Sequence, residues 1–545
     1  MKRYIPKIFT AVLAVGLLAS CNDQLEEYNP SGFTVESILA TPAGLETALN
    51  AAYTYHRELY GKTEGHGLME VGTDLWTYAA SAQEPQLATY ENLRTDQSWI
   101  RSKMWTPSYQ AINLINTVLK NLETVEVEPA RKLVMEGELR FLRAWYYWHL
   151  VETFGPVHFT LEPTVGMVTT ANRTPVDKVY EQIFQDMDFA VANLTATPAR
   201  VAGNSPDYGR VTKPAAEAFL ARLHLTRGNN RQASDLAQKV ISSYNFRLVP
   251  VYADLWKMSN LRNSEVVWAI NHSTNLTHNG GSNKANTIYG FDYRNIPGMV
   301  RDVANGRPDA RYMPTRFLLE LFDEQKDARF AGSFKQVWYA NQSDAAKRPA
   351  GMKVGDTAVY VSKNVVPENK RAGKVHLIYD INDVYAADGT PKDRAHYLAL
   401  TKHDDPNRPN ANEDQSSRDV FLIRLAEMYL IVAEAEHKLG NNGVAAEYLN
   451  KVRERAALPG KTADMRVEAD DITLDFILDE RAREFAGEML RWFDLKRTGK
   501  LVERVKAHNP DAAPNIQAYH VLRPIPQAQM DAVTNKDEFL QNPEY

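Results

Sequence analysis

Two stretches of the chain, LARLHLTRGNNRQASDLAQKV at residues 220–240 and YLIVAEAEHKLGNNGVAAEYLNKV at residues 429–452, follow one pattern. Gly228-Asn229-Asn230 in the first stretch corresponds to Gly440-Asn441-Asn442 in the second, 212 residues later. Each copy reads as a helix, a Gly-Asn turn and a second helix, because the apolar residues recur at helical spacing on both sides of the turn. The stretch therefore predicts a helical hairpin that occurs twice.

A small residue recurs at the point where the two helices of each hairpin must approach closely. It is Ala233 in the first copy and Ala445 in the second. Hairpins of this kind are the unit of tetratricopeptide-like scaffolds, although any tight helical hairpin favours glycine in its turn. Because the related copies lie far apart in sequence, we expect one helical scaffold that is interrupted between them, and hence a single domain over residues 21–545.

The remaining sequence divides into helical and irregular blocks. Helical periodicity or start signals mark residues 42–59, 104–123, 129–152, 175–194, 213–227, 231–244, 418–438, 442–457 and 473–497. Residues 246–417 instead scatter Gly, Asn, Pro and Asp among short β-prone runs such as EVVWAI and TAVYV. We expect a mostly α fold with an N-terminal helical scaffold at 35–245, an irregular region with short strands at 246–417, and a C-terminal helical scaffold and tail at 418–545.

The N-terminus carries export features and the only cysteine of the chain. Lys2, Arg3 and Lys7 precede a short apolar run at residues 8–18, which is the order of a signal peptide. One thiol forms no intramolecular disulfide, and a zinc or iron–sulfur site needs several such ligands. The stretch LASC, which ends at Cys21, resembles a bacterial lipobox, with a chance match in an ordinary export signal as the alternative.

The lipobox resemblance implies cleavage of the signal peptide at residues 1–20 and acylation of Cys21. Asn22 and the acids Asp23, Glu26 and Glu27 follow, and this tract is similar to those that direct some lipoproteins to the outer face of the outer membrane. No later segment approaches 18 uninterrupted apolar residues, so we expect the lipid to be the sole membrane anchor.

The charge balance argues against nucleic acid as a partner. The chain has 63 Lys and Arg against 68 Asp and Glu, a net charge of −5, and loss of residues 1–20 leaves 60 basic side chains and a net charge of −8. Phosphate backbones are bound by concentrations of positive charge. We therefore expect no nucleic-acid partner.

The segment ILDERAREFAGEMLRWFDLKRTGK, residues 477–500, looks most like catalytic machinery. Glu480, Glu484 and Glu488 follow one another at helical spacing, about 5 to 6 Å apart at Cβ, which is close to the carboxyl spacing in retaining glycosidases. The arginines of the same stretch would keep these carboxylates ionised, whereas a general acid needs a raised pKa. We expect a structural ion-pair network here.

Other catalytic and metal signatures are absent from the sequence. The chain has no HExxH, GxSxG or GxGxxG motif, and its 13 histidines are scattered rather than placed at ligand spacing. Gly460-Lys461-Thr462 mimics the end of a phosphate loop, but no strand precedes it. We expect no catalytic residue, no metal site and no cofactor.

Aromatic residues fall into two groups. Phe141, Trp145 and Trp148 in RFLRAWYYWHLVETFGPV repeat at helical spacing and predict a core stripe. Other aromatics lie in expected loops, where large rings are candidate ligand contacts, or else fill small hydrophobic clusters beneath the loops. These loop aromatics are Trp76, Tyr78, Tyr90 and Trp99 in the first long connection, and Tyr289, Tyr293, Tyr312, Trp338 and Tyr339 in the irregular region.

Six motifs follow one another in order along the chain: RFLRAWYYWHLVETFGPVHF, RVTKPAAEAFLARLHL, RDVFLIRLAEMYLIVAEAEHKLG, EYLNKVRERAAL, ILDERAREFAGEMLRWFDLKRTGKL and LRPIPQAQMDAVTNKDEFLQNPEY. Together they resemble the successive motifs of the SusD/RagB family of outer-membrane nutrient-binding lipoproteins. The resemblance implies a tetratricopeptide-like scaffold with an irregular, loop-rich ligand-binding region. It also implies cell-surface binding of a glycan and delivery to a SusC-like TonB-dependent outer-membrane transporter, without catalysis.

A sugar offers an apolar face for aromatic rings and hydroxyl groups for polar side chains. We expect the two loop segments to project from one face, with Trp76 and Tyr90 near Tyr289, Tyr293 or Trp338. Asp74 and Arg294 should supply hydrogen bonds at the rim, and Tyr78 and Trp99 are further candidates.

Three alternatives stay open from the sequence. The ligand is a peptide in some relatives of this kind, a glycosidase on an α-helical scaffold would need exposed carboxylates without arginine partners, and a pure protein–protein scaffold would bind no small ligand. In RDVANGRPDARYMPT, Arg301, Arg307 and Arg311 suit acidic sugars, but we expect structural pairing with Asp302 and Asp309.

Overall fold

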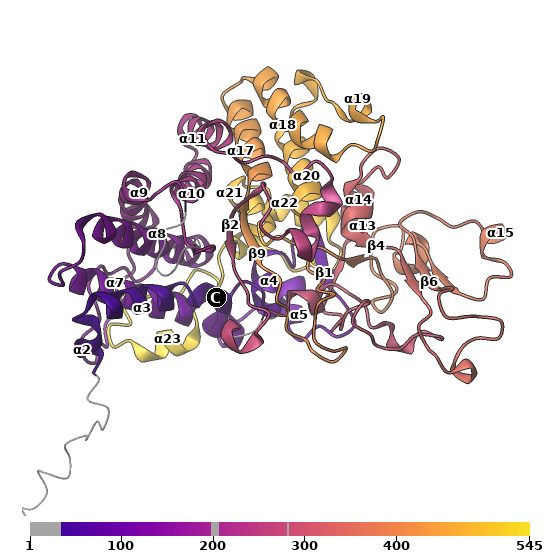
Figure 1. Cartoon of the computed structure of the whole chain (residues 1–545), viewed down its shortest axis with the longest axis horizontal. Coiled ribbons are helices and arrows are strands. Elements are labelled where there is room, and N and C mark those ends of the chain that lie inside the picture. The colour runs from indigo at the N-terminus through magenta and orange to yellow at the C-terminus, as the bar shows by residue number, and fades with distance from the viewer. Residues whose placement is uncertain (1–33, 198–206, 281–282) are drawn as a thin grey trace, which may run out of the picture.

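The computed structural model describes residues 34–197, 207–280 and 283–545 (Figure 1). The expected signal peptide and the lipidation site Cys21 lie outside the described residues. Most described elements are helices, and the strands are short, which confirms the mostly α fold with tetratricopeptide-like hairpins.

The repeated stretches form two helical hairpins that pack side by side. The first consists of α10 (Lys213–Thr226) and α11 (Asn230–Ser243), and the second of α17 (Leu425–Lys438) and α18 (Asn442–Ala456). Helix α11 packs against α17, so the four helices form one continuous layer, although about two hundred residues separate the two hairpins (Figure 1).

Glycine in each turn meets a backbone requirement. Gly228 has φ of 77° and Gly440 has φ of 82°, in the left-handed region where a Cβ is unfavourable. Ala233 and Ala445 are fully buried between the helices, as the close approach requires. The turn and the small residue therefore play the roles that the repeat predicts.

The N-terminal block contains the long helices and several short ones. The long helices are α3 (Pro42–Ala52), α7 (Thr106–Leu122), α8 (Pro129–Phe154) and α9 (Val176–Asn193). Short turns of helix are α2 (Val35–Leu39), α4 (Thr63–Met69), α5 (Pro85–Thr89), α6 (Ser98–Ile100) and the π-helical η2 (Arg101–Trp105). Phe141, Trp145 and Trp148 of α8 are buried, which confirms the core stripe.

The irregular region contains short paired strands. Strand β1 (Trp76–Tyr78) pairs with β3 (Tyr312–Pro314), β2 (Val266–Ile270) with β9 (Val420–Arg424), and β4 (Phe334–Lys335) with β8 (Ala399–Leu400), all antiparallel. Strands β5 (Val337–Tyr339), β6 (Thr357–Val361) and β7 (Leu377–Tyr379) form a small sheet in which β6 and β7 are parallel. The β-prone runs EVVWAI and TAVYV correspond to β2 and β6.

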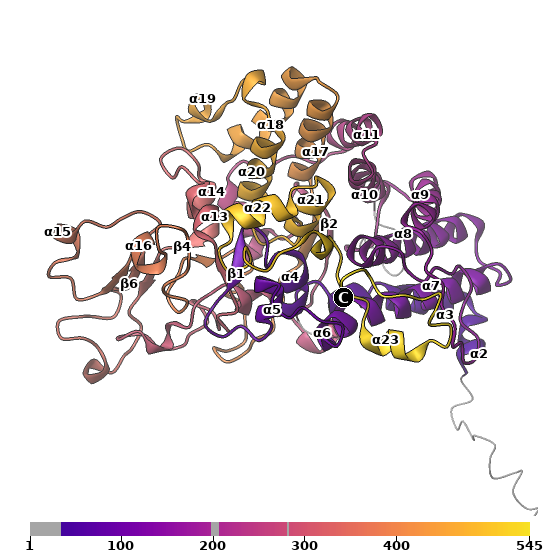
Figure 2. The ribbon, with the colours of Figure 1, turned by 180° about the vertical axis from the view of Figure 1, so that it is seen from behind.

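Short helices join these strands. They are α12 (Ala285–Ile288), α13 (Arg316–Glu320), α14 (Arg329–Ser333), α15 (Glu368–Arg371) and α16 (Ile381–Val384). A second cluster of buried side chains lies beneath this region, next to the larger core that the two helical blocks share. Figure 2 shows the irregular region with α15, α16 and β6 at one end of the molecule and α7, α8 and α9 at the other.

Three expected helices differ from the structure. The helix expected at 42–59 ends at Ala52, and a short 3-10 helix, η1 (Tyr55–Glu58), follows it. Residues 420–424 form strand β9 instead of the start of a helix, because their apolar run pairs with β2. The expected helix at 473–497 breaks into α20 (Leu474–Phe485) and α21 (Arg491–Arg497), since Gly487 and Met489 take positive φ between them. The C-terminal block also contains α19 (Thr462–Met465), α22 (Leu501–His508) and α23 (Gln527–Ala532).

Membrane-spanning helices are missing from the part of the chain that the structure describes, since each helix there is too short or too polar to cross a bilayer.

We predict that Gly440→Ala lowers the free energy of unfolding by about 1 kcal/mol, because a Cβ disfavours the left-handed conformation by about that amount. No atom lies within 4 Å of the position that the Cβ would take, so the cost comes from the backbone and not from a clash. Urea denaturation measures the change.

Gly443→Ala is the matched control. Gly443 lies three residues further along, inside α18, has no positive φ and likewise has open space around the added Cβ. Alanine favours a helix, so this variant should be as stable as the parent or more stable. Equal effects of the two substitutions would show that the turn conformation does not matter.

Candidate functional site

The two loop segments that carry most of the candidate residues lie against each other. Trp76 pairs with Pro314 and Tyr78 with Tyr312 in the β1–β3 ladder. The rings of Trp76 and Tyr289 are 4.5 Å apart between centroids. The expected proximity of the first long connection and the irregular region is therefore confirmed.

The prediction that these aromatic side chains are exposed is wrong for most of them. Trp76 is fully buried, and Tyr293 is 1% exposed. The segments face each other, so their rings pack into the core beneath the irregular region or against the helical core instead of facing solvent. The candidates that this burial removes from the surface are Asp74, Trp76, Tyr90, Trp99, Tyr289, Tyr293 and Trp338.

Contrary to the expectation, Asp74 has a structural role and does not lie at the rim of a ligand site. Its carboxylate accepts hydrogen bonds from Arg491 at 2.6 and 2.7 Å and from Arg504 at 2.8 Å. Burial opposes ionisation of this group, but the two guanidinium groups outweigh it and lower the pKa of Asp74. Asp74 thereby fixes the start of β1 to α21 and α22.

Two predicted residues reach the surface. Tyr78 is half-buried, and the guanidinium of Arg394 lies 3.7 Å from its ring centroid, so one face of the ring is covered. Arg294 is exposed and pairs with Asp292. Both stay candidates for ligand contact.

Tyr339, one of the loop aromatics of the irregular region, is exposed. Its side chain is 57% exposed, and within the described part of the irregular region no other Phe, Tyr or Trp is exposed to this degree. Trp338, one residue earlier in β5, is buried against Phe291. Side chains alternate between the two faces of a strand, so the register of β5 decides which of the two neighbouring rings meets solvent.

Four arginines lie on the segment from residue 294 to residue 311, and Arg301 interacts electrostatically with Arg294 and Arg307. We refer to Arg294, Arg301, Arg307 and Arg311 as the arginine cluster. Arg307 lies 3.1 Å from Asp414 and 3.7 Å from Asp309. Arg311 donates to the backbone oxygen of Ser81 at 2.7 Å. The expected pairing of Arg307 with Asp309 is present.

Arg301 differs from the expectation, since it forms no ion pair with Asp302. The carboxylate of Asp302 instead accepts from Asn305 at 2.6 and 2.9 Å and from Asn341 at 2.5 Å. The guanidinium of Arg301 donates one long hydrogen bond, to Oδ1 of Asn412 at 3.4 Å. Asn341 also bonds to Gly298 and Val300, so the end of β5 with Tyr339 is fixed to the loop that carries Arg301.

A recess of about 650 Å³, a volume typical of ligand sites, lies elsewhere on the molecule. It lies beside η2 and the start of α7, and its lining includes Tyr55, Arg57, Glu58, Arg101, Gln110 and His278. Figure 2 shows the neighbouring short helices α4, α5 and α6 side by side, consistent with their packing contacts.

A backbone hydrogen bond and two ion pairs join the segment that follows Glu58 to the arginine cluster. Glu58 in the recess pairs with Lys103 at 3.6 Å. The backbone nitrogen of Lys284 donates to Gly61 at 2.7 Å, and its ammonium group lies 2.8 Å from Asp414, the partner of Arg307. We refer to the recess, the Lys284–Asp414 pair and the arginine cluster as the polar face.

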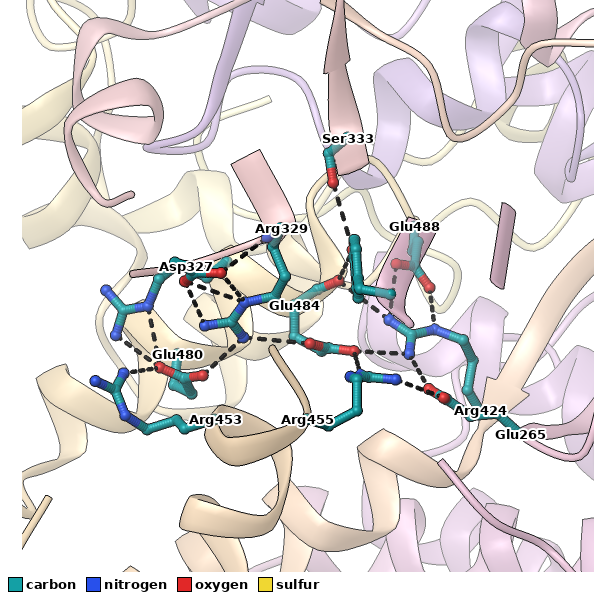
Figure 3. A network of polar contacts seen from close by, with 12 residues as sticks. Glu265, Asp327, Arg329, Ser333, Arg424, Arg453, Arg455, Glu480, Glu484 and Glu488 are labelled. Atoms are coloured by element: carbon teal, nitrogen blue, oxygen red, sulfur yellow. Dashed lines mark hydrogen bonds and ion pairs between the residues drawn. The ribbon is translucent and has the colours of Figure 1, made fainter. Parts of the chain in front are cut away.

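The three glutamates that resembled a catalytic set lie in a buried ion-pair network (Figure 3). Glu480 contacts Arg329 and Arg453 at 2.7 Å each, and Glu484 contacts Arg424 at 2.9 Å and Arg329 at 3.2 Å. Glu488, in the turn after α20, contacts Arg424 at 2.7 Å and Lys402 at 2.8 Å. Solvent does not reach Glu480 or Glu484.

The network holds these carboxylates ionised. Burial raises the pKa of Glu484, but Arg455, Arg424 and Arg329 outweigh burial and leave the pKa lowered. The pKa values of Glu480 and Glu488 are lowered in the same way by their cationic neighbours. A general acid needs the opposite shift and access to substrate, so these three residues act as structural ion pairs.

The described residues also contain no group of three or more His, Cys, Asp or Glu arranged to hold a metal ion.

Comparisons of the sequence with family profiles and with known proteins agree on one family. The sequence profile of the SusD family matches residues 256–545, and the profile described as "Starch-binding associating with outer membrane" matches residues 25–225. A SusD-like protein of Formosa agariphila is 26% identical, with 96% of each chain covered. The starch-binding protein SusD of Bacteroides thetaiotaomicron is 24% identical over 79% of this chain and 76% of its own.

A solved structure shows the same fold. A laminarin-binding SusD-like protein superposes with a TM-score of 0.67 and 22% sequence identity, over 93% of this chain and all of that protein. The mostly helical scaffold and the irregular region therefore belong to a known architecture.

We predict that Glu484→Gln lowers the free energy of unfolding by on the order of 3 kcal/mol, because it leaves Arg329, Arg424 and Arg455 poorly paired in a buried site. Glu447→Gln, at an exposed position of α18, is the matched control and should have little effect. Thermal and urea denaturation measure both changes.

Acid should weaken the same network. The folded-state pKa values of these glutamates lie below the unfolded value of about 4.3, so the stabilisation is complete above that pH and is lost as the pH falls further. The parent should lose more stability than Glu484→Gln on acidification. A stable Glu484→Gln variant that has lost ligand binding would instead place the binding site at this helix.

Proposed function

The chain belongs to the SusD family, and from this membership we propose that it is a glycan-binding lipoprotein of the outer-membrane surface. In this proposal a lipid on Cys21 anchors the protein, the arginine cluster and the neighbouring Tyr339 bind an oligo- or polysaccharide, and a SusC-like TonB-dependent transporter receives the glycan. Catalysis is not part of the proposed role.

The match of two family profiles along most of the chain is the observation that carries the proposal. One profile is described as starch-binding and outer-membrane associated, and a relative aligned over most of its length is a starch-binding protein. SusD-like proteins are binding proteins, so a surface that captures glycan is the function that this family membership favours.

The chemistry of the irregular region supports the same proposal. A sugar ring has an apolar face that stacks on aromatic side chains, and its hydroxyl groups need hydrogen-bonding partners nearby. Tyr339 offers an exposed ring, while Asn341 and Arg301 lie on the segments fixed to it. Tyr78 and Arg294 are further proposed contacts at the surface of the same region.

The carboxylates favour binding over turnover. A retaining glycosidase needs two accessible carboxyl groups, one of them with a raised pKa. Glu480 and Glu484 are buried and paired with arginines, so the most catalytic-looking motif of the sequence gives no support to a glycosidase. Incubation of the purified protein with a bound polysaccharide, followed by analysis for new reducing ends, tests for turnover.

We predict that Tyr339→Ala weakens glycan binding about tenfold, because stacking on one ring contributes about 1 to 3 kcal/mol and a puckered sugar should gain the lower value. The melting temperature should stay within a degree or two, since the ring is 57% exposed and supports little core. Isothermal titration with a glycan that the parent binds measures the affinity.

Tyr208→Ala is the matched control for Tyr339→Ala. Tyr208 is 50% exposed and lies between α9 and α10, outside the irregular region. Its removal should leave glycan affinity unchanged. If the control weakens binding and Tyr339→Ala does not, the binding surface lies on the helical scaffold and the proposed face is wrong.

We predict that Cys21→Ala releases an otherwise folded protein from the membrane fraction, because the proposed lipid is the sole anchor. The parent should incorporate labelled palmitate and the variant should not. The assay is done in cells that lack the partner transporter, so that binding to the barrel does not retain the variant. A variant that remains in the membrane fraction of such cells contradicts the anchor.

A further inference from the structure

We propose that the bound glycan is acidic, with carboxylate or sulfate groups that Arg301 binds together with Arg294 and Arg307. This inference rests on the proposed function and specifies the class of its substrate.

Arg301 has unused hydrogen-bonding capacity in a half-buried position. A guanidinium group carries five N–H donors. The Nε of Arg301 is buried and donates to no described residue, and the contact of its terminal nitrogen with Asn412 is long, at 3.4 Å. Buried donors without an acceptor reduce stability, so an acceptor supplied by a ligand would complete this group.

The same pattern extends along the cluster. The Nε atoms of Arg307 and Arg311 are also buried without a partner among the described residues. Ion pairs to the four arginines come from only three carboxylates in the described chain, those of Asp292, Asp309 and Asp414. Asp414 is shared with Lys284, so these five cations have three ion-paired carboxylates between them, and the nearby carboxylate of Asp302 is bonded to Asn305 and Asn341 instead.

The neighbours of Arg301 increase the local positive potential. Burial is the main cause that lowers the pKa of Arg301, and repulsion from Arg294 and Arg307 adds to it. The folded protein therefore holds this cation in an unfavourable setting, and an anion placed between the three side chains would relieve the repulsion. Among the described residues the guanidinium of Arg301 has only the long bond to Asn412, so it contributes little to holding the fold together.

Anionic groups on a sugar suit this geometry better than hydroxyl groups do. Guanidinium groups bind carboxylates and sulfur or phosphorus oxyanions through two parallel hydrogen bonds, which are stronger than bonds to neutral acceptors. The cluster adjoins the exposed ring of Tyr339 through Asn341, so an acidic group and an apolar sugar face would find partners on adjacent segments.

The first experiment compares acidic glycans with their neutralised forms. The detergent-purified full-length lipoprotein is applied to an array of plant and algal polysaccharides, with each uronate-containing glycan beside its carboxyl-reduced form and each sulfated glycan beside its desulfated form. We expect binding to acidic members, loss of it after neutralisation, and weaker binding at high salt. The reduced and desulfated pairs distinguish carboxylate from sulfate.

Three results separate the two proposals. Equal or stronger binding to the neutralised forms overturns the acidic class and leaves the glycan-binding function standing. Binding to no glycan of either class overturns both proposals. Binding to acidic glycans that Arg301 substitutions leave unchanged overturns the assignment to the arginine cluster.

The second experiment uses substitutions. Arg301→Gln should weaken binding of the acidic glycan about tenfold or more, as expected for loss of a charge-assisted pair, and leave the melting temperature unchanged or higher. Arg301→Lys should restore only part of the affinity, because an ammonium group lacks the planar fork. Arg247→Gln, at an exposed position after α11, is the matched control and should bind like the parent.

Arg294→Gln provides a second route if Arg301→Gln does not fold. Arg294 is exposed, and its ion pair is local, with Asp292 two residues away, so its removal should not disturb the fold. Reduced affinity for the acidic glycan with a normal melting temperature supports the cluster, and unchanged affinity contradicts it.

Discussion

Ion pairs between buried arginines and the glutamates of α20 hold together segments that are distant in sequence. Arg329 comes from the irregular region, Arg424 from β9, and Arg453 from α18, and each contacts Glu480 or Glu484 at 2.7 to 3.2 Å. Burying a charged group away from water costs free energy unless the group has a partner of opposite charge. The segments must therefore dock in one arrangement, because any other would leave a buried charge unpaired. The irregular region is positioned on the scaffold by this requirement, and the polar face depends on it.

The helices of the scaffold could be predicted from helical periodicity. Strands that pair with distant segments could not, because such pairing leaves no local pattern in the sequence. The stripe of Phe141, Trp145 and Trp148 and the glycine turns at Gly228 and Gly440 follow from local rules, and the structure has them where expected. The run at 420–424 is apolar enough for either a helix or a strand, and only its pairing with β2 decides. The same limit applies to the turn between α20 and α21, where Gly487 and Met489 take positive φ in a segment that the periodicity would have continued as a helix.

The candidate site shows that the burial of side chains in loops could not be predicted from the sequence. Trp76 and Tyr289 lie in segments that read as surface loops, and they do come together, but each covers the other. Trp338 and Tyr339 differ by one position in a short strand, and that position separates a buried ring from one that is 57% exposed. Which loop residues face solvent depends on tertiary partners, so neither composition nor spacing identifies them.

The pairing of β2 with β9 has a consequence for how such proteins diversify. Ile270 lies opposite Val420, so the chain leaves the scaffold and returns to it at adjacent positions, whatever it does in between. The cost of closing a longer excursion rises slowly, by about 0.6 kcal/mol for each doubling of its length. The outer loops of an insert closed in this way can be lengthened or shortened while Arg329 keeps its partners in the scaffold, so that new ligand preferences can arise without a change in the hairpins.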